Sequence, residues 1–189
     1  RSEVCDVLAA QNTAWNAPPP MGQHIEELRQ PRAVAVLTGQ QTGLFGGPLF
    51  TLYKALTAVR LAARLRIDLQ RPVIPIFWMT SEDHDVAEVD HVHLLDRTGT
   101  LVTVRHASWG PPPGFLPANL RLGPAILETL DRTWSLLPTT EFSPALREAL
   151  GRAFAPDRTL ADAFAHWALH LLGESGLVLV DGADPRLKR

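Results

Sequence analysis

The segment from Thr38 to Leu49 reads Thr-Gly-Gln-Gln-Thr-Gly-Leu-Phe-Gly-Gly-Pro-Leu, and it decides which fold is predicted. An apolar run over residues 33–38 leads into it and has the pattern of a buried strand, and a helix pattern over residues 49–65 leads out of it. Pro48 suits the first turn of that helix, where its missing N–H would have no partner anyway. The segment is therefore predicted to be a strand-to-helix turn that is rich in glycine and free of charge.

A second continuous apolar run, over residues 73–78, completes a β-α-β unit and predicts a parallel sheet with a right-handed crossover. The rest of the pattern predicts a β-hairpin over 89–105 with its turn at 96–99, helices near 123–135, 143–152 and 159–172, and a strand at 177–181. The predicted fold class is α/β, with a Rossmann-like, mostly parallel sheet, a small appended β-hairpin and helical segments.

The domain prediction separates an N-terminal helical segment, residues 1–30, from an incomplete Rossmann-like core, residues 31–189, which includes the hairpin and a helical insertion at 123–172. We expect a partial chain, because it begins with Arg1 and because only eight residues follow the last predicted strand. In the helix after the glycine-rich turn, one face is predicted to pack in the core through its apolar residues: Leu49, Leu52, Tyr53, Leu56, Val59 and Ala63.

Composition excludes several classes of protein. With 189 residues, of which 46% are hydrophobic, the chain can bury a real core. A net charge of −2 without a basic patch argues against a nucleic-acid partner, and no apolar run is long enough to predict a membrane partner. A single cysteine, Cys5, excludes an internal disulfide and predicts a cytoplasmic location.

The glycine-glutamine loop, which we define as residues 38–47, is predicted to lie at the carboxyl end of the first strand, where open parallel sheets bind ligands. Glycines let the backbone approach a ligand, and the two glutamines supply neutral donors and acceptors. The predicted ligand-binding residues here are Gly39, Gln40, Gln41, Gly43 and Gly47. Their spacing matches neither common phosphate-loop pattern, and the alternative is a tight turn whose glycines only permit packing.

A second polar segment, residues 81–90, follows the second strand and holds five acids without a Lys or Arg. Such a concentration of carboxylates favours a polar ligand or a cation. His84, between Asp83 and Asp85, is predicted to transfer protons. The alternative is a solvated helix N-terminus, whose dipole the acids would offset.

Two histidines, His91 and His93, share one face of the predicted hairpin. With Asp83 or Asp85 they would provide metal ligands, which leaves a metal site as a further alternative. No metal is assigned from the sequence.

Residues 36–55 and 75–85 together resemble the signature of the bacillithiol-biosynthesis cysteine-adding enzymes. Weaker similarity extends to residues 24–28 and to residues 176–181 with Asp184 and Pro185. Members of that family are longer, with further Rossmann elements and a helical coiled coil that pairs subunits, so the resemblance implies an N-terminal portion of a homodimer.

The resemblance implies a carbon–nitrogen ligase that joins cysteine to the amino group of glucosaminyl-malate in the last step of bacillithiol synthesis. The family's core is similar to nucleotidyltransferases, which implies ATP as cosubstrate and an activated cysteinyl carboxylate. It implies that His84 accepts the proton of the attacking amine, with Asp83 and Asp85 beside it as catalytic residues. The resemblance also implies that Lys54, Ser81 and Glu82 bind substrate or nucleotide. Gln40 and Gln41 stand where nucleotidyltransferases hold triphosphate with histidines.

Two other interpretations remain open. One is a nucleotidyltransferase-like enzyme of another small-molecule pathway that stops at the adenylate. The other is a non-catalytic module that binds a nucleotide or a sugar.

Overall fold

The computed structural model describes residues 1–83, 85–106 and 120–188, and the prediction for His84 lies outside them. The chain forms two compact units, which are described separately. Unit 1 comprises Arg1–Gln40, Leu49–Ser81 and Ala168–Arg189, and unit 2 comprises Gln41–Pro48 and Glu82–Trp167. The predicted boundary between a helical segment, residues 1–30, and the Rossmann-like core stays a prediction, because the helical segment and part of that core both belong to unit 1.

Unit 1 is built on a parallel sheet with the strand order β1-β2-β5. Its strands are β1 (Val34–Gln40), β2 (Val73–Met79) and β5 (Val178–Asp181). The register pairs Val34 with Val73 and Ile76 with Val178, so all three strands end at the same edge. The Rossmann-like prediction and its three strands are confirmed.

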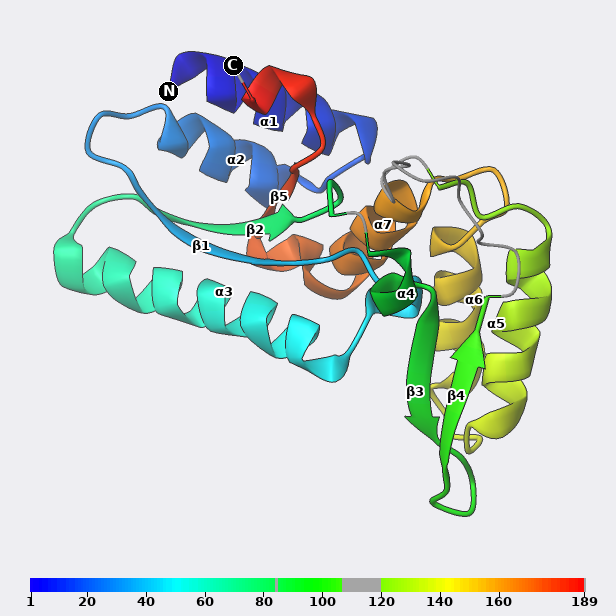
Figure 1. Cartoon of the computed structure of the whole chain (residues 1–189). Coiled ribbons are helices and arrows are strands. Elements are labelled where there is room, and N and C mark those ends of the chain that lie inside the picture. Colours follow the sequence, from blue (N-terminus) through cyan, green and yellow to red (C-terminus); the bar gives the residue numbers. More distant parts are fainter. Residues whose placement is uncertain (84, 107–119, 189) are drawn as a thin grey trace. The chain divides into compact units, whose positions relative to one another are not determined.

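Helices cover both faces of this sheet, as Figure 1 shows: α1 (Ser2–Ala14) and α2 (Pro19–Leu28) lie on one face, and α3 (Leu49–Leu69) lies on the other. Cys5, Leu8 and Ile25 of the first two helices pack against Ile74 and Val178 of the sheet. Cys5 is fully buried with a free thiol, and its side chain packs there as a small apolar group. Two short 3-10 turns, Gly173–Ser175 and Pro185–Leu187, flank β5.

The outer edge of β5 is covered by two side-chain amides of α1. Asn12 donates to the carbonyls of Leu8 and Leu179 and accepts from the N–H of Leu179. Gln11 accepts from the N–H of Asp181. These bonds replace those of a further strand, and they stop a short edge strand from pairing with another chain.

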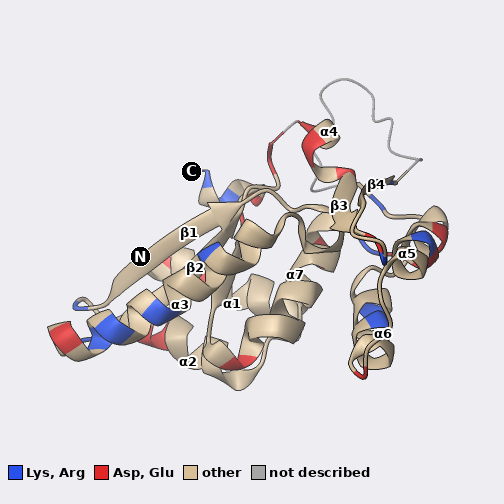
Figure 2. Ribbon diagram, turned by 90° about the horizontal axis from the view of Figure 1, so that it is seen from below, with Lys and Arg blue, Asp and Glu red and all other residues tan. Residues whose placement is uncertain are grey.

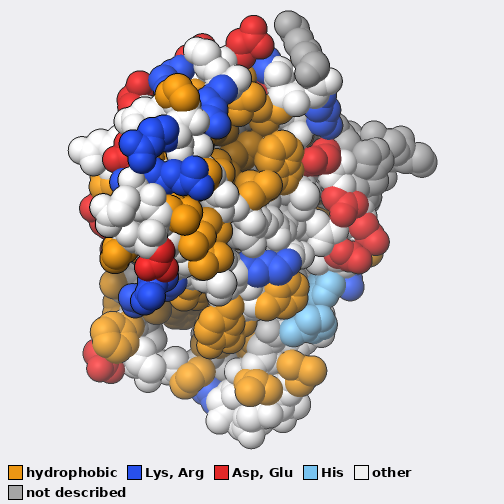
Figure 3. All heavy atoms as spheres, turned by 90° about the vertical axis from the view of Figure 1, so that its left-hand side faces the viewer, with side chains coloured by type: hydrophobic (Ala, Val, Ile, Leu, Met, Phe, Trp, Pro, Cys, Tyr) orange, Lys and Arg blue, Asp and Glu red, His pale blue; other side chains and the backbone are white. Residues whose placement is uncertain are grey.

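The predicted core face of α3 is wrong. The buried residues of this helix are Thr51, Ala55, Ala58 and Ala62, whereas none of the six predicted residues is buried. Leu49 is 65% exposed and Tyr53 is 61% exposed. Small side chains let the helix lie close to the sheet, so the alanine face faces inward and the large apolar face stays outside. Exposed hydrophobic side chains are visible in orange in Figure 3.

Unit 2 contains the predicted hairpin and the predicted helices. Its elements are η1 (Leu44–Gly46), α4 (Val86–Val89), β3 (His91–Leu95), β4 (Leu101–Arg105), α5 (Ala125–Leu136), α6 (Ser143–Ala153) and most of α7 (Leu160–Leu172). The strands β3 and β4 pair antiparallel, with His91 opposite Arg105. Leu44, Leu122, Ile126, Phe154 and Leu160 form the centre of its core. Within the described residues, no helix has the length and apolar character needed to cross a membrane.

Candidate functional site

The boundary between the two units passes through both predicted motifs. It falls between Gln40 and Gln41 in the glycine-glutamine loop, and between Ser81 and Glu82 in the acidic segment. Each motif therefore contributes residues to both units.

In unit 1, the end of β1 brings together Gly39, Gln40 and Lys54. The Lys54 ammonium donates to the Gln40 side-chain oxygen at 2.8 Å and to the Gly39 carbonyl at 3.3 Å. An ammonium group has three N–H donors, so one donor remains for a ligand. A Cβ at Gly39 would lie 2.7 Å from the Trp78 carbonyl oxygen of the adjacent strand, so only glycine fits this position without a shift. The structure thus groups three of the predicted binding residues around one positive charge.

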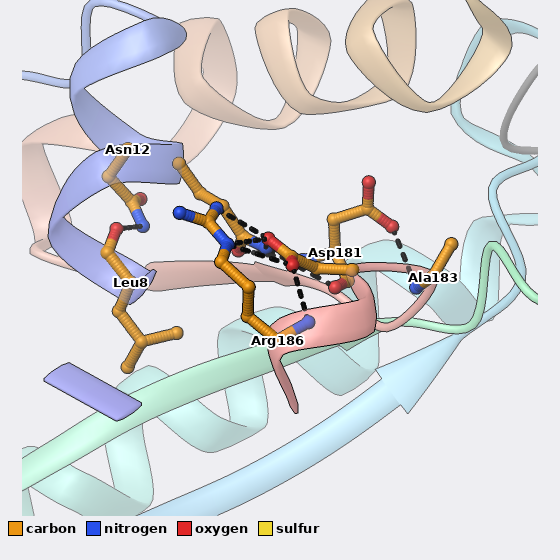
Figure 4. Close-up of polar contacts among 7 residues, drawn as sticks. Leu8, Asn12, Asp181, Ala183 and Arg186 are labelled. Atoms are coloured by element: carbon orange, nitrogen blue, oxygen red, sulfur yellow. Dashed lines mark hydrogen bonds and ion pairs between the residues drawn. The ribbon is translucent and has the colours of Figure 1, made fainter. Parts of the chain in front are cut away.

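Ser81, also in unit 1, is fully buried at the end of β2. Its hydroxyl donates to the Asp181 carboxylate at the end of β5 and accepts from the N–H of Ala183 at 3.1 Å. Figure 4 shows the Asp181 carboxylate facing the backbone of Ala183, to which it is joined by a 3.0 Å hydrogen bond. This contact joins the carboxyl ends of two strands. The proposed role of Ser81 in substrate binding stays a prediction.

A further polar cluster at this edge escaped the sequence interpretation. Asp184 accepts a 2.9 Å hydrogen bond from Gln11 of α1 and bonds of 2.6 to 3.2 Å from Arg186. Figure 4 labels Arg186 and draws its hydrogen bonds as dashed lines. The hydrogen bonds from Arg186, and secondarily the one from Gln11, hold the pKa of Asp184 well below its usual range. The cluster fixes the segment after β5 against α1. The sequence signal was the Asp-Pro pair at 184–185, which belongs to the weaker part of the resemblance and indicates no partner for Asp184.

In unit 2, Gly43 and Gly47 close the glycine-glutamine loop on itself. A Cβ at Gly43 would lie 2.7 Å from the Cα of Gly47, and Gly47 has a φ of 72°, which L-residues with side chains rarely adopt. These two glycines are required by the turn itself, as the packing alternative proposed. Their contact with a ligand stays a prediction.

The middle of the same loop is anchored by Phe45. This residue has a φ of 52° and a ψ of 26°, in the left-handed region that bulky side chains avoid. Its ring packs edge-to-face on Phe154 with 5.1 Å between centroids, inside the core of unit 2. Core packing therefore holds a backbone conformation that the loop would not adopt alone.

The two predicted motifs meet in unit 2 through Gln41 and Asp83. The Gln41 amide nitrogen donates to the Asp83 carboxylate at 2.7 Å. The other carboxylate oxygen accepts from the N–H of Asp85 at 3.3 Å. The structure therefore places one predicted catalytic residue in direct contact with one predicted binding residue.

The described acids of this segment have different roles. Asp85 caps α4 by accepting from the N–H of Ala87 at 3.1 Å, as the helix N-terminus alternative proposed. Asp90 is paired with Arg105 and His91, so its negative charge is compensated within the protein. In Figure 2 the acidic positions (red) occupy the segment that leads into α4. Asp83 and Asp85 are exposed, and Glu82 is half-buried.

Thr42 is a residue of the loop that the sequence interpretation overlooked. Its side chain is only 1% exposed, and its hydroxyl has no hydrogen-bond partner among the described residues. A buried hydroxyl without a partner costs free energy, which a ligand would recover. Thr42 is therefore a candidate ligand-binding residue. The sequence gives no signal for it, because threonine is common in turns.

The metal alternative that combined the histidines with Asp83 or Asp85 is not supported. Among the described residues no group of three His, Cys, Asp or Glu side chains is arranged to hold an ion. Asp83 and Asp85 are engaged with Gln41 and with backbone N–H groups. That the acidic segment, residues 81–90, binds no metal stays a prediction.

Comparison with known proteins gives the family. The chain matches, over residues 1–189, the model of the N-terminal Rossmann-like domain of bacillithiol biosynthesis BshC. The chain belongs to the BshC family. It is similar to proteins named "Putative cysteine ligase BshC" from Salinibacter ruber (37% identity over 188 residues), Koribacter versatilis (40% over 189) and Anoxybacillus flavithermus (34% over 191).

Each of these alignments covers 100% of this chain but only 34 to 35% of the relative. The chain thus spans about one third of the length of the curated BshC relatives that it matches. The parallel sheet of unit 1 is what the Rossmann-like description of this family's N-terminal domain leads one to expect.

Proposed function

We propose that this chain is the N-terminal part of a carbon–nitrogen ligase that adds cysteine to the amino group of glucosaminyl-malate in bacillithiol biosynthesis. The observation that carries the proposal is the BshC match over the whole chain, with relatives named as cysteine ligases. In support, the glycine-glutamine loop and the acidic segment that characterise the resemblance are in contact through Gln41 and Asp83.

The proposed reaction has two steps. The cysteine carboxylate attacks the α-phosphorus of the cosubstrate ATP and releases pyrophosphate, which gives a cysteinyl adenylate. The amine of glucosaminyl-malate then attacks the activated carbonyl carbon, the C–N bond forms, and AMP leaves with the electron pair of the broken C–O bond. One amine proton must be removed, and we assign it to His84.

The described residues suit substrates with phosphate and amino groups. Lys54 has a donor left over after its bonds to Gly39 and Gln40, and a phosphate oxygen would accept it. Asp83 is exposed and its acidic group would bind a substrate ammonium. A general base such as His84 typically contributes about 10²–10⁴-fold to the rate.

The test uses the full-length protein with cysteine and glucosaminyl-malate, with and without ATP, followed by mass spectrometry. Product that forms only with ATP supports the ligase with an activated carboxylate. Product that forms without ATP overturns the activation step and keeps the substrates. Cysteinyl adenylate without product favours a nucleotidyltransferase-like enzyme, and ligand binding without any reaction favours a binding module.

Variants then test the residues. Asp83→Asn and His84→Gln are expected to lose product while they retain binding of ATP. Glu88→Gln is the matched control, since Glu88 is an exposed acid of the same segment without an assigned role. Unchanged turnover in both Asp83→Asn and His84→Gln would remove the proposed catalytic residues.

A further inference from the structure

Two histidines of β3 form a pair on the outer face of the hairpin of unit 2. Side chains alternate along a strand, and Val92 between them packs against the core, so His91 and His93 point away from it. Their rings meet at an interplanar angle of 73° with 4.6 Å between centroids. The two Nε2 atoms lie 3.0 Å apart. Histidine side chains reach the molecular surface in Figure 3 (pale blue).

The other nitrogen of each ring has its own partner. His91 Nδ1 lies 3.0 Å from a carboxylate oxygen of Asp90, which directs its proton to Nδ1 and leaves the lone pair on Nε2. His93 Nδ1 lies 2.9 Å from the hydroxyl of Thr103, the residue opposite on β4. Carboxylates and other acceptors in these positions orient metal-binding imidazoles in proteins.

The charge around the pair is balanced. Arg105 lies opposite His91 on β4 and would repel a cation, but both oxygens of Asp90 accept hydrogen bonds from its guanidinium. The Asp90 side chain is only 9% exposed, so this carboxylate is held in place between Arg105 and His91. The positive charge of Arg105 beside the pair is therefore compensated by Asp90. The His93 side chain is exposed, and the His91 side chain is 17% exposed.

From this geometry we infer that the Nε2 atoms of His91 and His93 chelate one divalent transition-metal ion. With metal–nitrogen bonds of about 2.05 Å, two nitrogens 3.0 Å apart subtend an angle of roughly 95° at the ion. That angle fits adjacent positions of a tetragonal site, which Cu²⁺ and Ni²⁺ prefer, better than a tetrahedral site. No third protein ligand joins them among the described residues, so water or small-molecule oxygens complete the coordination.

The same distance would also arise from a metal-free hydrogen bond. In that case Thr103 donates to His93 Nδ1, and His93 Nε2–H donates to His91 Nε2. The two arrangements differ in one measurable property, the binding of a metal ion by both rings.

The test titrates the metal-stripped full-length protein with Cu²⁺ in a glycine buffer, which competes for loosely bound ions, and records the electron paramagnetic resonance spectrum. We expect one Cu²⁺ per chain with coupling to two nitrogens. His91→Gln and His93→Gln are each expected to weaken binding at least about tenfold, and Thr103→Val to weaken it about 10–100-fold through the lost partner of His93.

His170→Gln, which removes an exposed histidine of α7, is the matched control and should bind Cu²⁺ like the native protein. Circular dichroism melts of each variant verify that the hairpin unit is folded. Absence of Cu²⁺ binding to the folded native protein would overturn the inference and leave the hydrogen-bonded pair. Equal stoichiometry and an equal spectrum in the folded double variant of His91 and His93 would also overturn it.

Discussion

Gln41 donates a 2.7 Å hydrogen bond to Asp83 across 42 residues of sequence, and this bond joins the glycine-glutamine loop to the acidic segment.

The Gln41–Asp83 hydrogen bond predicts that a negative charge at position 41 lowers activity. Gln41→Glu keeps the shape of the side chain but places a carboxylate against a carboxylate, which raises the free energy of the paired loops. We expect ligation by the full-length protein to fall on the order of tenfold, about 1.4 kcal/mol. Steady-state kinetics measure it, with Gln23→Glu, at an exposed position of α2, as control. Equal losses in the two variants would mean that net charge, not the Asp83 contact, matters.

Gly43→Ala tests the closure of the loop. The new methyl would meet the Cα of Gly47 at 2.7 Å, so the loop backbone must move. We expect a loss of about 1–3 kcal/mol in the free energy of unfolding, measured by denaturant titration. Gly22→Ala is the matched control, because it lies within α2 and has no atom within 4 Å of the added methyl. That variant should gain about 0.5–1 kcal/mol. A neutral Gly43→Ala would show that the turn is less tightly closed than described.

Thr42→Val tests the buried hydroxyl. Replacing a buried, unpartnered hydroxyl with a methyl group should stabilise the protein by about 1–3 kcal/mol. If the hydroxyl binds a ligand, the same change lowers turnover, so stability and activity move in opposite directions. Thr133→Val is the contrasting variant, since its hydroxyl donates to the Thr129 carbonyl at 2.8 Å and its loss should destabilise. A more stable Thr42→Val protein with full activity would remove Thr42 from the site.

Two histidines of unit 2 predict instability in acid. Burial lowers the pKa of His106, whose ring contacts the Thr129 hydroxyl and the Leu122 carbonyl. Burial, and secondarily the charge of Arg158, lowers the pKa of His166. The unfolded chain therefore binds these protons more readily than the folded one. Above pH 6.5, the ordinary pKa of histidine, both side chains are neutral in the folded and the unfolded chain, and the folded protein has its full stability. As the pH falls below that value toward the lowered pKa values of the folded state, the unfolded chain takes up protons first, and the free energy of unfolding decreases.

Thermal melts between about pH 8 and pH 5 measure this dependence. The melting temperature is expected to fall with pH, and to fall less steeply in His106→Gln, which keeps a polar side chain but does not titrate in this range. His170→Gln, at an exposed position, should retain the native slope. An unchanged slope in His106→Gln would show that other groups carry the acid sensitivity.

The sheet was predictable because its information is local. Continuous apolar runs at 33–38 and 73–78 predict strands, and the glycine-rich turn that follows the first permits a sharp reversal. The expected burial on both faces holds for β2, whereas Leu37 of β1 is 61% exposed. The packing face of α3 was not predictable by the same means. Periodicity identified its large apolar side chains, but the sheet packs against Ala55, Ala58 and Ala62, and helix propensity does not distinguish the two faces.

The candidate site also has features that the sequence predicts and features that it does not. Residue types placed Gln41 and Asp83 among the candidates, but their direct contact depends on how two distant segments fold together. The burial of the Thr42 hydroxyl and the contact of Asp184 with Gln11 depend on neighbours from distant parts of the chain, and no spacing in the sequence encodes them.

The division of the chain has a consequence for biosynthesis. The polypeptide passes between the two units four times, and β5 is translated only after all of unit 2. On the ribosome, about a hundred residues are therefore translated between β2 and β5, the strand that pairs with the second edge of β2. At about 5–20 residues per second, this edge stays unpaired for several seconds. During that interval an apolar edge is exposed to other nascent chains. Slow translation through the segment that encodes unit 2 would lengthen this exposure and increase the dependence of the protein on chaperones.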